Sequence, residues 1–243
     1  MGIYAMTGGA TGIGAELKRQ LLAAGHEVIS VDIREGDIIA DLSTAEGRQR
    51  AIDGIRERAP DGLDGYIPCA GLPPVAKPLS IIGQVNYFAA VETVAGLRDL
   101  LAMRRGTVLI VASNSAPMIR NDDPFVQACL SGNEEEASLI IESRDGHSAY
   151  AGSKRALILW MRRNVVYYAA AGVRLNAVAP GITQTPLSEQ VMADVELGDA
   201  MKQFAEMVPW GGTAQPADIA NVMRFMLSAE AGFVCGSVFF VDG

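Results

Sequence analysis

The sequence predicts an α/β fold in which a single domain is built on a doubly wound parallel sheet. Short runs that are apolar throughout, as strands buried on both faces are, alternate along the chain with amphipathic stretches of helical spacing. Such alternation is typical of a parallel sheet covered by helices on both sides. The chain has 243 residues and no linker rich in Pro, Gly or Ser, so we expect one domain over residues 1–243.

Six apolar runs predict the strands: residues 2–7, 27–32, 63–67, 107–112, 173–178 and 237–241. The amphipathic stretches 13–24, 150–171 and 217–227 predict helices, and residues 79–103 are expected to be mostly helical. A further helix is expected to begin at a capping box formed by Ser43 and Glu46. Apolar residues recur behind that box at helical spacing until Pro60 stops the helix.

One segment interrupts the alternation. More than 30 residues separate the fourth strand from the helix at Tyr150, which is too long for an ordinary connection. Asp123 precedes Pro124, and Asn133 precedes Glu134, and both pairs are typical of helix starts. We therefore expect residues 121–146 to be an insertion with two short helices that covers a site.

Charge and composition exclude several classes of protein. The net charge of −8 argues against nucleic acid as a partner, and no apolar run is long enough for a membrane span. The insertion holds seven acidic residues against one arginine, so it carries −6 of that charge, and its run Glu134-Glu135-Glu136 is expected to be a solvated first helical turn. Three scattered cysteines and the lack of a leader segment predict a cytoplasmic protein, and two distant histidines predict no metal site.

A glycine-rich turn lies between the first strand and the first helix. Gly8, Gly12 and Gly14 would allow a tight turn and close backbone approach, so that the free N–H groups of the helix could hold a pyrophosphate. A plain tight turn is the alternative. The position of the motif favours a nucleotide loop and a Rossmann-like fold.

A carboxylate follows at the end of the second strand. Asp32 lies 18 residues after Gly14, where it could accept hydrogen bonds from both ribose hydroxyls of an adenosine and repel a 2′-phosphate. This predicts NAD over NADP, although Arg34 leaves the second cofactor open. Asp41 and Leu42, after the next short run, are weaker candidates for contact with the adenine edge.

The third motif pairs a phenol with an ammonium. Tyr150 and Lys154 lie four residues apart and share a helix face, so the ammonium would favour the phenolate and lower the pKa of Tyr150. Such a phenol can act as general acid and base for an alcohol or carbonyl oxygen. The alternative is a helix-face tyrosine beside a solvated lysine.

Together these residues resemble the short-chain dehydrogenases/reductases over essentially the whole chain. The resemblance rests on the TGGATGIG loop, Asp32, the turn Cys69-Ala70-Gly71, Asn86, a serine after the fourth strand, YxxxK, and the run NAVAPG at 176–181. Several runs further resemble a bacterial branch of that family, the 3α-hydroxysteroid dehydrogenase/carbonyl reductases, which also has an insertion before the catalytic tyrosine. These runs are DIR, ADLSTAEGR, CAGL, VNYF, YAGSK and GVRLN.

The resemblance implies roles for four catalytic residues. Tyr150 would exchange a proton with the substrate oxygen, and Lys154 would lower the pKa of Tyr150 and hold the nicotinamide ribose. Ser113 would hydrogen-bond the substrate oxygen, and Asn86 would position a water that relays protons from Lys154 to solvent. Ser115 is a second candidate for the serine.

The resemblance also implies a set of cofactor contacts. Thr11 and Ile13 would bind NAD together with the glycines of the loop. Gly71 would pack against the cofactor, and Ile182 and Thr185 would contact the nicotinamide carboxamide.

The chain departs from the family pattern in two places. Pro68-Cys69 stands where the family often has two asparagines, so the hydrogen bonds that anchor that turn must come from elsewhere. The step of 37 residues from Ser113 to Tyr150 far exceeds the usual spacing, so the two can meet only if the insertion loops out.

The function implied is an NAD-dependent oxidoreductase that interconverts a secondary alcohol and a ketone, on a hydroxysteroid or another bulky hydrophobic carbonyl. The alternatives are a dehydrogenase of aromatic or small cyclic alcohols and a non-catalytic NAD-binding sensor. Met201, Phe204, Met207 and Trp210 are expected to belong to a substrate lid, with a core role as the alternative. An insertion next to the YxxxK helix favours a homodimer, with a tetramer still possible.

Overall fold

A computed structural model describes residues 1–243 and contains one sheet of seven parallel strands. The strand order is β3-β2-β1-β4-β5-β6-β7. The strands are β1 Ile3–Thr7, β2 Glu27–Asp32, β3 Ile38–Ile39, β4 Gly65–Pro68, β5 Thr107–Val111, β6 Arg174–Pro180 and β7 Val238–Val241. The six expected strands and the parallel, doubly wound fold are confirmed, and β3 is an additional strand of two residues.

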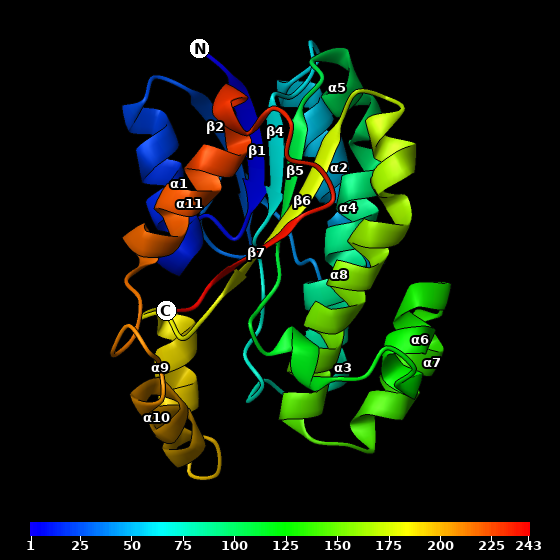
Figure 1. Cartoon of the computed structure of the whole chain (residues 1–243). Helices are drawn as coiled ribbons and strands as arrows, with labels where there is room; N and C mark the ends of the chain where they lie inside the picture. The colour runs from blue at the N-terminus through cyan, green and yellow to red at the C-terminus, as the bar shows by residue number, and fades with distance from the viewer.

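Helices cover both faces of this sheet (Figure 1). On one face lie α1 Gly12–Ala23 and α11 Pro216–Leu227, and on the other lie α2 Ala45–Arg58, α4 Ala90–Gly96, α5 Arg98–Met103 and α8 Gly146–Ala169. Each layer encloses its own core, of 14 buried residues under α1 and α11 and of 37 under the second layer. The continuous apolar runs of the strands are thus explained by burial on both sides.

The remaining helices gather near the carboxyl ends of the strands (Figure 1). They are α3 Ser80–Gly83, α6 Pro124–Ser131, α7 Glu134–Glu142, α9 Pro186–Met192 and α10 Gly198–Glu206. Short 3₁₀ turns at Ala116–Met118 and Ala229–Ala231 complete the chain.

The insertion folds as the sequence predicts, into two short helices. It is also expected to cover a site, but none of residues 121–146 lines the cavity described below. The Asp123 side chain caps α6 by accepting hydrogen bonds from the N–H groups of Phe125 and Val126. The Asn133 side chain caps α7 by accepting from the N–H of Glu136. Helix α6 packs against the amino-terminal half of α8, so the insertion loops out of the path between β5 and α8 (Figure 1).

Phe125 packs the insertion against helices α3 and α8. Its ring lies so close to Gly152 of α8 that a Cβ there would stand 2.8 Å from Cδ1 of the ring. It also lies against Gly83 of α3, where a Cβ would stand 3.3 Å from Cζ. Both glycines therefore make room for one buried aromatic side chain.

Two predictions about helix starts need correction. The capping residue of α2 is Thr44, whose side chain accepts from the N–H of Gly47, and not Ser43 with Glu46. Helix α8 begins four residues before Tyr150, because the Asp145 side chain accepts from the N–H of Ser148 and caps it.

The stretch 79–103 is helical but not one helix. A π-helical segment, η1 Gln84–Ala89, stands between α3 and α4, and Leu97 leaves helical geometry between α4 and α5. Segments of π-helix are rare and often lie at functional sites.

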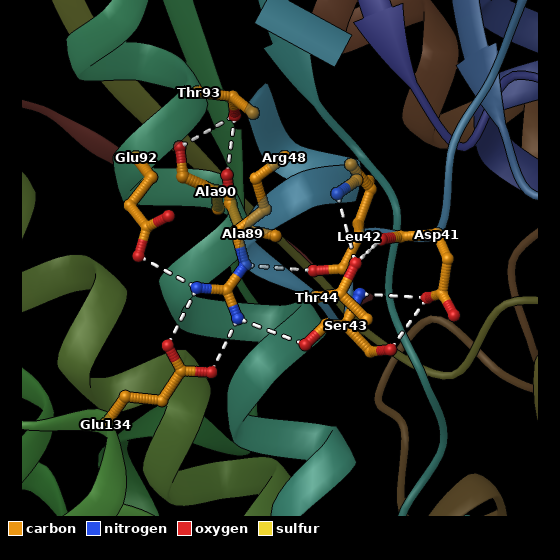
Figure 2. Close-up of polar contacts among 11 residues, drawn as sticks. Asp41, Leu42, Ser43, Thr44, Arg48, Ala89, Ala90, Glu92, Thr93 and Glu134 are labelled. Carbon is orange, nitrogen blue, oxygen red and sulfur yellow. Dashed lines mark hydrogen bonds and ion pairs between the residues drawn. The ribbon is translucent and has the colours of Figure 1, made fainter. Parts of the chain in front are cut away.

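The acidic run at the start of α7 is not wholly solvated. Glu134 forms an ion pair with Arg48 of α2, with 2.5 Å between Oε1 and the guanidinium nitrogen (Figure 2). The partner lies 86 residues away in the chain, so nothing in the local sequence could indicate it. Glu135 and Glu136 are exposed as expected.

Candidate active site

A cavity of about 650 Å³ lies at the carboxyl ends of the strands, where ligands bind in open α/β sheets. It reaches from the glycine loop after β1 to helices α9 and α10. Of the residues predicted to form the site, all line this cavity except Asn86. They are Gly8, Thr11, Gly12, Ile13, Gly14, Asp32, Asp41, Leu42, Gly71, Ser113, Tyr150, Lys154, Ile182 and Thr185.

The glycine loop has a backbone that only glycine permits. Gly8 and Gly12 have φ angles of +69° and +57°, in the left-handed region. A Cβ on Gly14 would stand 2.0 Å from the carbonyl oxygen of Gly8, so the start of α1 could not approach the loop. The Thr11 side chain makes no capping hydrogen bond, which leaves the first N–H groups of α1 for a ligand. The loop thus offers a cradle for an anion at a helix start.

Asp32 stands at the end of β2 beside this loop. One carboxylate oxygen accepts from the N–H of Ala10 at 3.3 Å and the other from the N–H of Ile33 at 2.8 Å. These bonds fix the carboxylate against the loop and leave further lone pairs for hydroxyl donors in the cavity.

The turn after β4 is anchored by a residue of β1. The Thr7 hydroxyl accepts from the N–H of Ala70 at 3.1 Å, which supplies a bond that the unusual Pro68-Cys69 sequence does not. A Cβ on Gly8 would stand 2.7 Å from the backbone of Ala70, so turn and loop are in direct contact. Gly8 is therefore required for packing as well as for its φ angle.

Tyr150 and Ser113 meet across the cavity despite the 37 residues between them. Ser113 follows β5 and is buried. Burial raises the pKa of Tyr150, while the nearby Ser113 hydroxyl lowers it. Ser115 also lines the cavity and donates to the Ser113 hydroxyl at 3.0 Å. Of the two serines, only Ser113 is thus among the groups that shift the pKa of Tyr150.

Lys154 is buried one helical turn beyond Tyr150. Its ammonium donates to the carbonyl oxygen of Val111 at 2.9 Å and lies 5.8 Å from the centre of the Tyr150 ring. No carboxylate pairs with it, and burial lowers the pKa of Lys154 to about 8. Lys154 is not among the causes of the shift in the pKa of Tyr150, so the predicted lowering of that pKa by the ammonium is not found.

Asn86 lies in η1, behind the cavity wall. Its side-chain oxygen accepts from the N–H of Leu72 at 2.7 Å, and its amide donates to the carbonyl of Leu72 at 3.1 Å. A Cβ on Gly71 would stand 3.4 Å from the Asn86 oxygen and 3.7 Å from the Lys154 ammonium. Asn86 therefore holds the turn that separates it from the cavity, and the predicted water relay stays a prediction.

Two further findings bear on the candidate chemistry. No three His, Cys, Asp or Glu side chains lie close enough together to hold a metal ion. None of the helices combines the length and apolar character required to cross a membrane.

Comparison with known proteins agrees with this geometry. A family described as enoyl-(acyl carrier protein) reductase matches residues 136–243, which include Tyr150 and Lys154. The 3-alpha-hydroxysteroid dehydrogenase/carbonyl reductase of Comamonas testosteroni is 39% identical over 250 residues, covering 100% of this chain and 96% of that protein. The chain belongs to the short-chain dehydrogenase/reductase family.

One solved structure and a second, more distant relative extend the comparison. The 3-alpha-hydroxysteroid dehydrogenase from Pseudomonas sp. B-0831, in complex with NADH, is similar with a TM-score of 0.96 and 40% identity, covering 99% of this chain and 95% of that one. The cis-4-hydroxycyclohexanecarboxylate dehydrogenase of Sinomonas cyclohexanicum is a more distant relative at 29% identity, covering 99% of this chain and 95% of that protein. The predicted family is thus confirmed, and so is the predicted resemblance to bacterial 3α-hydroxysteroid dehydrogenases.

The far end of the cavity in this short-chain dehydrogenase is apolar. Helices α9 and α10 contribute Leu187, Val191, Met201 and Phe204, and Leu197 directly precedes α10. Met201 and Phe204 therefore lie where the predicted lid would be.

The other two predicted lid residues do not belong to it. Met207 and Trp210 lie outside the cavity lining and are 69% and 90% exposed. They follow α10, and the N–H of Trp210 donates to the carbonyl of Gly243 near the end of β7.

Sequence reasoning missed several residues of the opposite wall. Ile81, Val85, Met118 and His147 line the cavity from α3, η1, the 3₁₀ turn and α8. Of these, only His147 could have been predicted from the sequence, because it lies three residues before Tyr150 and thus on the same side of the helix. The others come from segments whose fold the sequence did not define.

Proposed function

We propose that this protein is an NAD-dependent oxidoreductase that interconverts a secondary alcohol and a ketone of bulky, hydrophobic structure. The observation that carries the proposal is the convergence of Tyr150, Ser113 and Lys154 on the same cavity as the glycine loop. The relatives named above, which include a 3-alpha-hydroxysteroid dehydrogenase in complex with NADH, support it.

The residues present fit a dinucleotide. Gly8, Gly12 and Gly14 form a cradle that side chains would fill, at the start of α1, as a pyrophosphate requires. The Asp32 carboxylate has lone pairs for the two ribose hydroxyls and would repel a 2′-phosphate, which supports NAD over NADP. Asp41 and Leu42 would receive the adenine, and Ile182 and Thr185 the nicotinamide end.

The chain's own groups would move the proton. When bound, the cofactor supplies or accepts the hydride at the substrate carbon. The Tyr150 phenol, kept protonated by burial, donates its proton to the carbonyl oxygen on reduction and takes it back on oxidation. The Ser113 hydroxyl donates a hydrogen bond to the same oxygen as negative charge develops on it.

Lys154 would bring a positive charge to the site. With a pKa of about 8, its ammonium is largely charged at neutral pH, 5.8 Å from the centre of the Tyr150 ring. Lys154 would also lie against the nicotinamide ribose, as the family resemblance implies.

The cavity wall supports a bulky apolar substrate. More than half of its lining residues are hydrophobic, and they include Met201 and Phe204 of α10. The relative that acts on a hydroxycyclohexanecarboxylate favours a smaller cyclic alcohol as a second candidate.

Removal of one oxygen atom, that of the Tyr150 phenol, tests the mechanism. Tyr150→Phe should lower kcat by about 10²- to 10⁴-fold, the usual contribution of general acid–base catalysis. The Kd for NADH should stay within twofold, since the ring is kept. Tyr167→Phe, on the exposed side of the same helix, is the matched control and should turn over normally.

The assay follows NADH absorbance with hydroxysteroids, cyclic alcohols and the corresponding ketones. Turnover of cyclohexanols but not of steroids would favour the second candidate. A wild-type protein that binds NADH and turns over none of these compounds would favour the non-catalytic sensor instead. Retained turnover in Tyr150→Phe would refute the proton-transfer role.

We also propose that the chain forms a cytoplasmic homodimer. Helix α6 of the insertion covers part of α8, the helix through which family members commonly associate (Figure 1). On the opposite side, the edge strand β7 and helix α11 present Phe225 and Phe240 at 45% and 47% exposure. An apolar edge of this kind supports association through a single face. All three cysteines are free, in keeping with a reducing compartment.

A further inference from the structure

Arg48 of α2 is a buried cation that the reaction does not use. Its side chain is 2% exposed, and its guanidinium meets two carboxylates, Glu92 of α4 and Glu134 of α7 (Figure 2). The Glu134 contact is bidentate, at 2.5 and 2.7 Å, and Glu92 accepts at 2.8 Å. Three elements from distant parts of the sequence therefore meet at one side chain.

The remaining hydrogen bonds of Arg48 go to the backbone. Its Nε donates to the carbonyl of Leu42 at 3.0 Å, and a terminal nitrogen donates to the carbonyl of Ser43 at 3.2 Å (Figure 2). With the three bonds to the carboxylates, all five N–H groups of the guanidinium are used. Its orientation is therefore fixed by partners on both sides.

The backbone that Arg48 holds belongs to the cavity wall. Asp41 and Leu42 line the cavity at the end where Asp32 stands. The Asp41 carboxylate accepts from the N–H and the hydroxyl of Ser43, at 3.0 and 2.7 Å (Figure 2). Residues 41–43 thus form one hydrogen-bonded turn, and a shift of the Ser43 carbonyl is transmitted to Asp41.

Close packing on the helix side leaves this turn little freedom. A Cβ on Gly47 would stand 1.7 Å from the carbonyl oxygen of Asp41, so α2 lies directly against it. The Asp41 carbonyl also accepts from the hydroxyl of Thr44 at 3.1 Å. The other two carbonyls of the turn, those of Leu42 and Ser43, are held by the Arg48 guanidinium, so the position of the turn also depends on Arg48.

Glu134 completes the connection from the insertion. It is the first residue of α7, and its carboxylate supplies two of the five acceptors of Arg48. Without it the guanidinium would keep Glu92 but lose the bidentate contact that sets its plane. The two backbone carbonyls would then be held less firmly.

We propose that Arg48, held by Glu134 of the inserted helix, is a positioning residue for the adenine end of the cofactor site. The inference rests on the proposed function, since it takes the occupant of that end to be the adenosine half of NAD. The insertion then has two roles: it covers part of α8, and it stabilises the cavity wall that receives the cofactor.

The test removes the carboxylate of Glu134 and measures binding of two ligands. Glu134→Ala should raise the Kd for NADH and for ADP-ribose by the same factor, about 3- to 10-fold, a usual size for a coupling mutation. Equal factors are expected because ADP-ribose contains the adenosine half and lacks the nicotinamide. The kcat at saturating NADH should stay within twofold, because the reacting groups are untouched.

Two further variants separate positioning from stability. Glu135→Ala removes the same charge from the same helical turn, at an exposed site, and should leave both Kd values unchanged. Glu134→Gln keeps the size of the side chain and one acceptor oxygen, so it should fold as the wild type does and give an intermediate Kd.

The outcomes are distinct. Folded Glu134→Ala and Glu134→Gln proteins that bind ADP-ribose as tightly as the wild type would overturn the inference and leave the proposed function intact. An equal loss in Glu135→Ala would also overturn it, since the effect would then belong to the charge of the helix start. A wild-type protein that binds neither NADH nor ADP-ribose would overturn the proposed function first.

Discussion

The buried lysine of the site makes a prediction about stability that can be worked out from its surroundings. Lys154 has no carboxylate partner and one hydrogen bond, to the Val111 carbonyl, and burial lowers its pKa from 10.5 to about 8. Below pH 8 the folded protein bears the cost of a charge that the unfolded chain carries in water. We therefore expect Lys154→Met to abolish activity and yet stabilise the fold at neutral pH.

The size of the effect follows from the two pKa values. The gap between 10.5 and about 8 corresponds to about 3 kcal/mol at neutral pH. The variant leaves the Val111 carbonyl without a donor, at a cost of about 1 kcal/mol. The net gain in free energy of unfolding is about 2 kcal/mol, or about 4–8 °C in Tm for a chain of this size.

The sign reverses with pH. A group whose pKa is lower in the folded state destabilises the fold fully below that pKa, and less as pH rises towards the unfolded value. The stability of the wild type therefore rises relative to that of Lys154→Met between pH 8 and 10.5. At the upper end only the lost hydrogen bond distinguishes them, and the variant is then the less stable protein.

Urea unfolding of both proteins at pH 7 and pH 10 measures the difference. Lys202→Met, at an exposed lysine of α10, is the control and should show no such pH dependence. A Lys154→Met protein that is less stable than the wild type by the same amount at both pH values would refute the reasoning.

Three further predictions address the site and the assembly. Ser113→Ala should lower kcat by about 10²- to 10³-fold, as the loss of an oxyanion donor does, whereas Ser115→Ala should cost less than about tenfold because Ser115 acts through Ser113. Equal losses would contradict that assignment. Asp32→Ala should lower the preference for NADH over NADPH by at least about tenfold, which is the worth of one charged hydrogen bond. Asp32→Asn keeps an acceptor oxygen and should therefore show how much of that preference is due to charge. An unchanged preference in both variants would exclude the ribose role. Sedimentation should give a dimer, and a tetramer would count against the role of α6 in covering α8.

The strands could be predicted because burial on both faces leaves a strong local signal. Residues such as those of 107–112 are apolar without interruption, and all of β5 is buried. The two residues of β3, Ile38–Ile39, are too few to carry such a signal. Helix starts were predicted where the cap is followed by proline or acidic residues, as at Asp123 and Asn133.

Other features depend on contacts that the local sequence does not record. The π-helical segment around Asn86 has ordinary helical composition, and Asn86 bonds to Leu72, which lies 14 residues away in the chain. The choice between Ser113 and Ser115 depends on which hydroxyl reaches Tyr150. Glu134 looked solvated because its partner Arg48 comes from another part of the chain.

The insertion is not a separable appendage, because the body of this protein is shaped to receive it. Gly83 and Gly152 leave space for Phe125, and Arg48 is buried with Glu134 as one of its two carboxylates. Deletion of residues 121–146 would open a void beside α8 and leave a buried guanidinium with half its counter-charge. Conversion to a minimal scaffold would therefore need compensating changes at these three positions, and loop shortening alone would not achieve it.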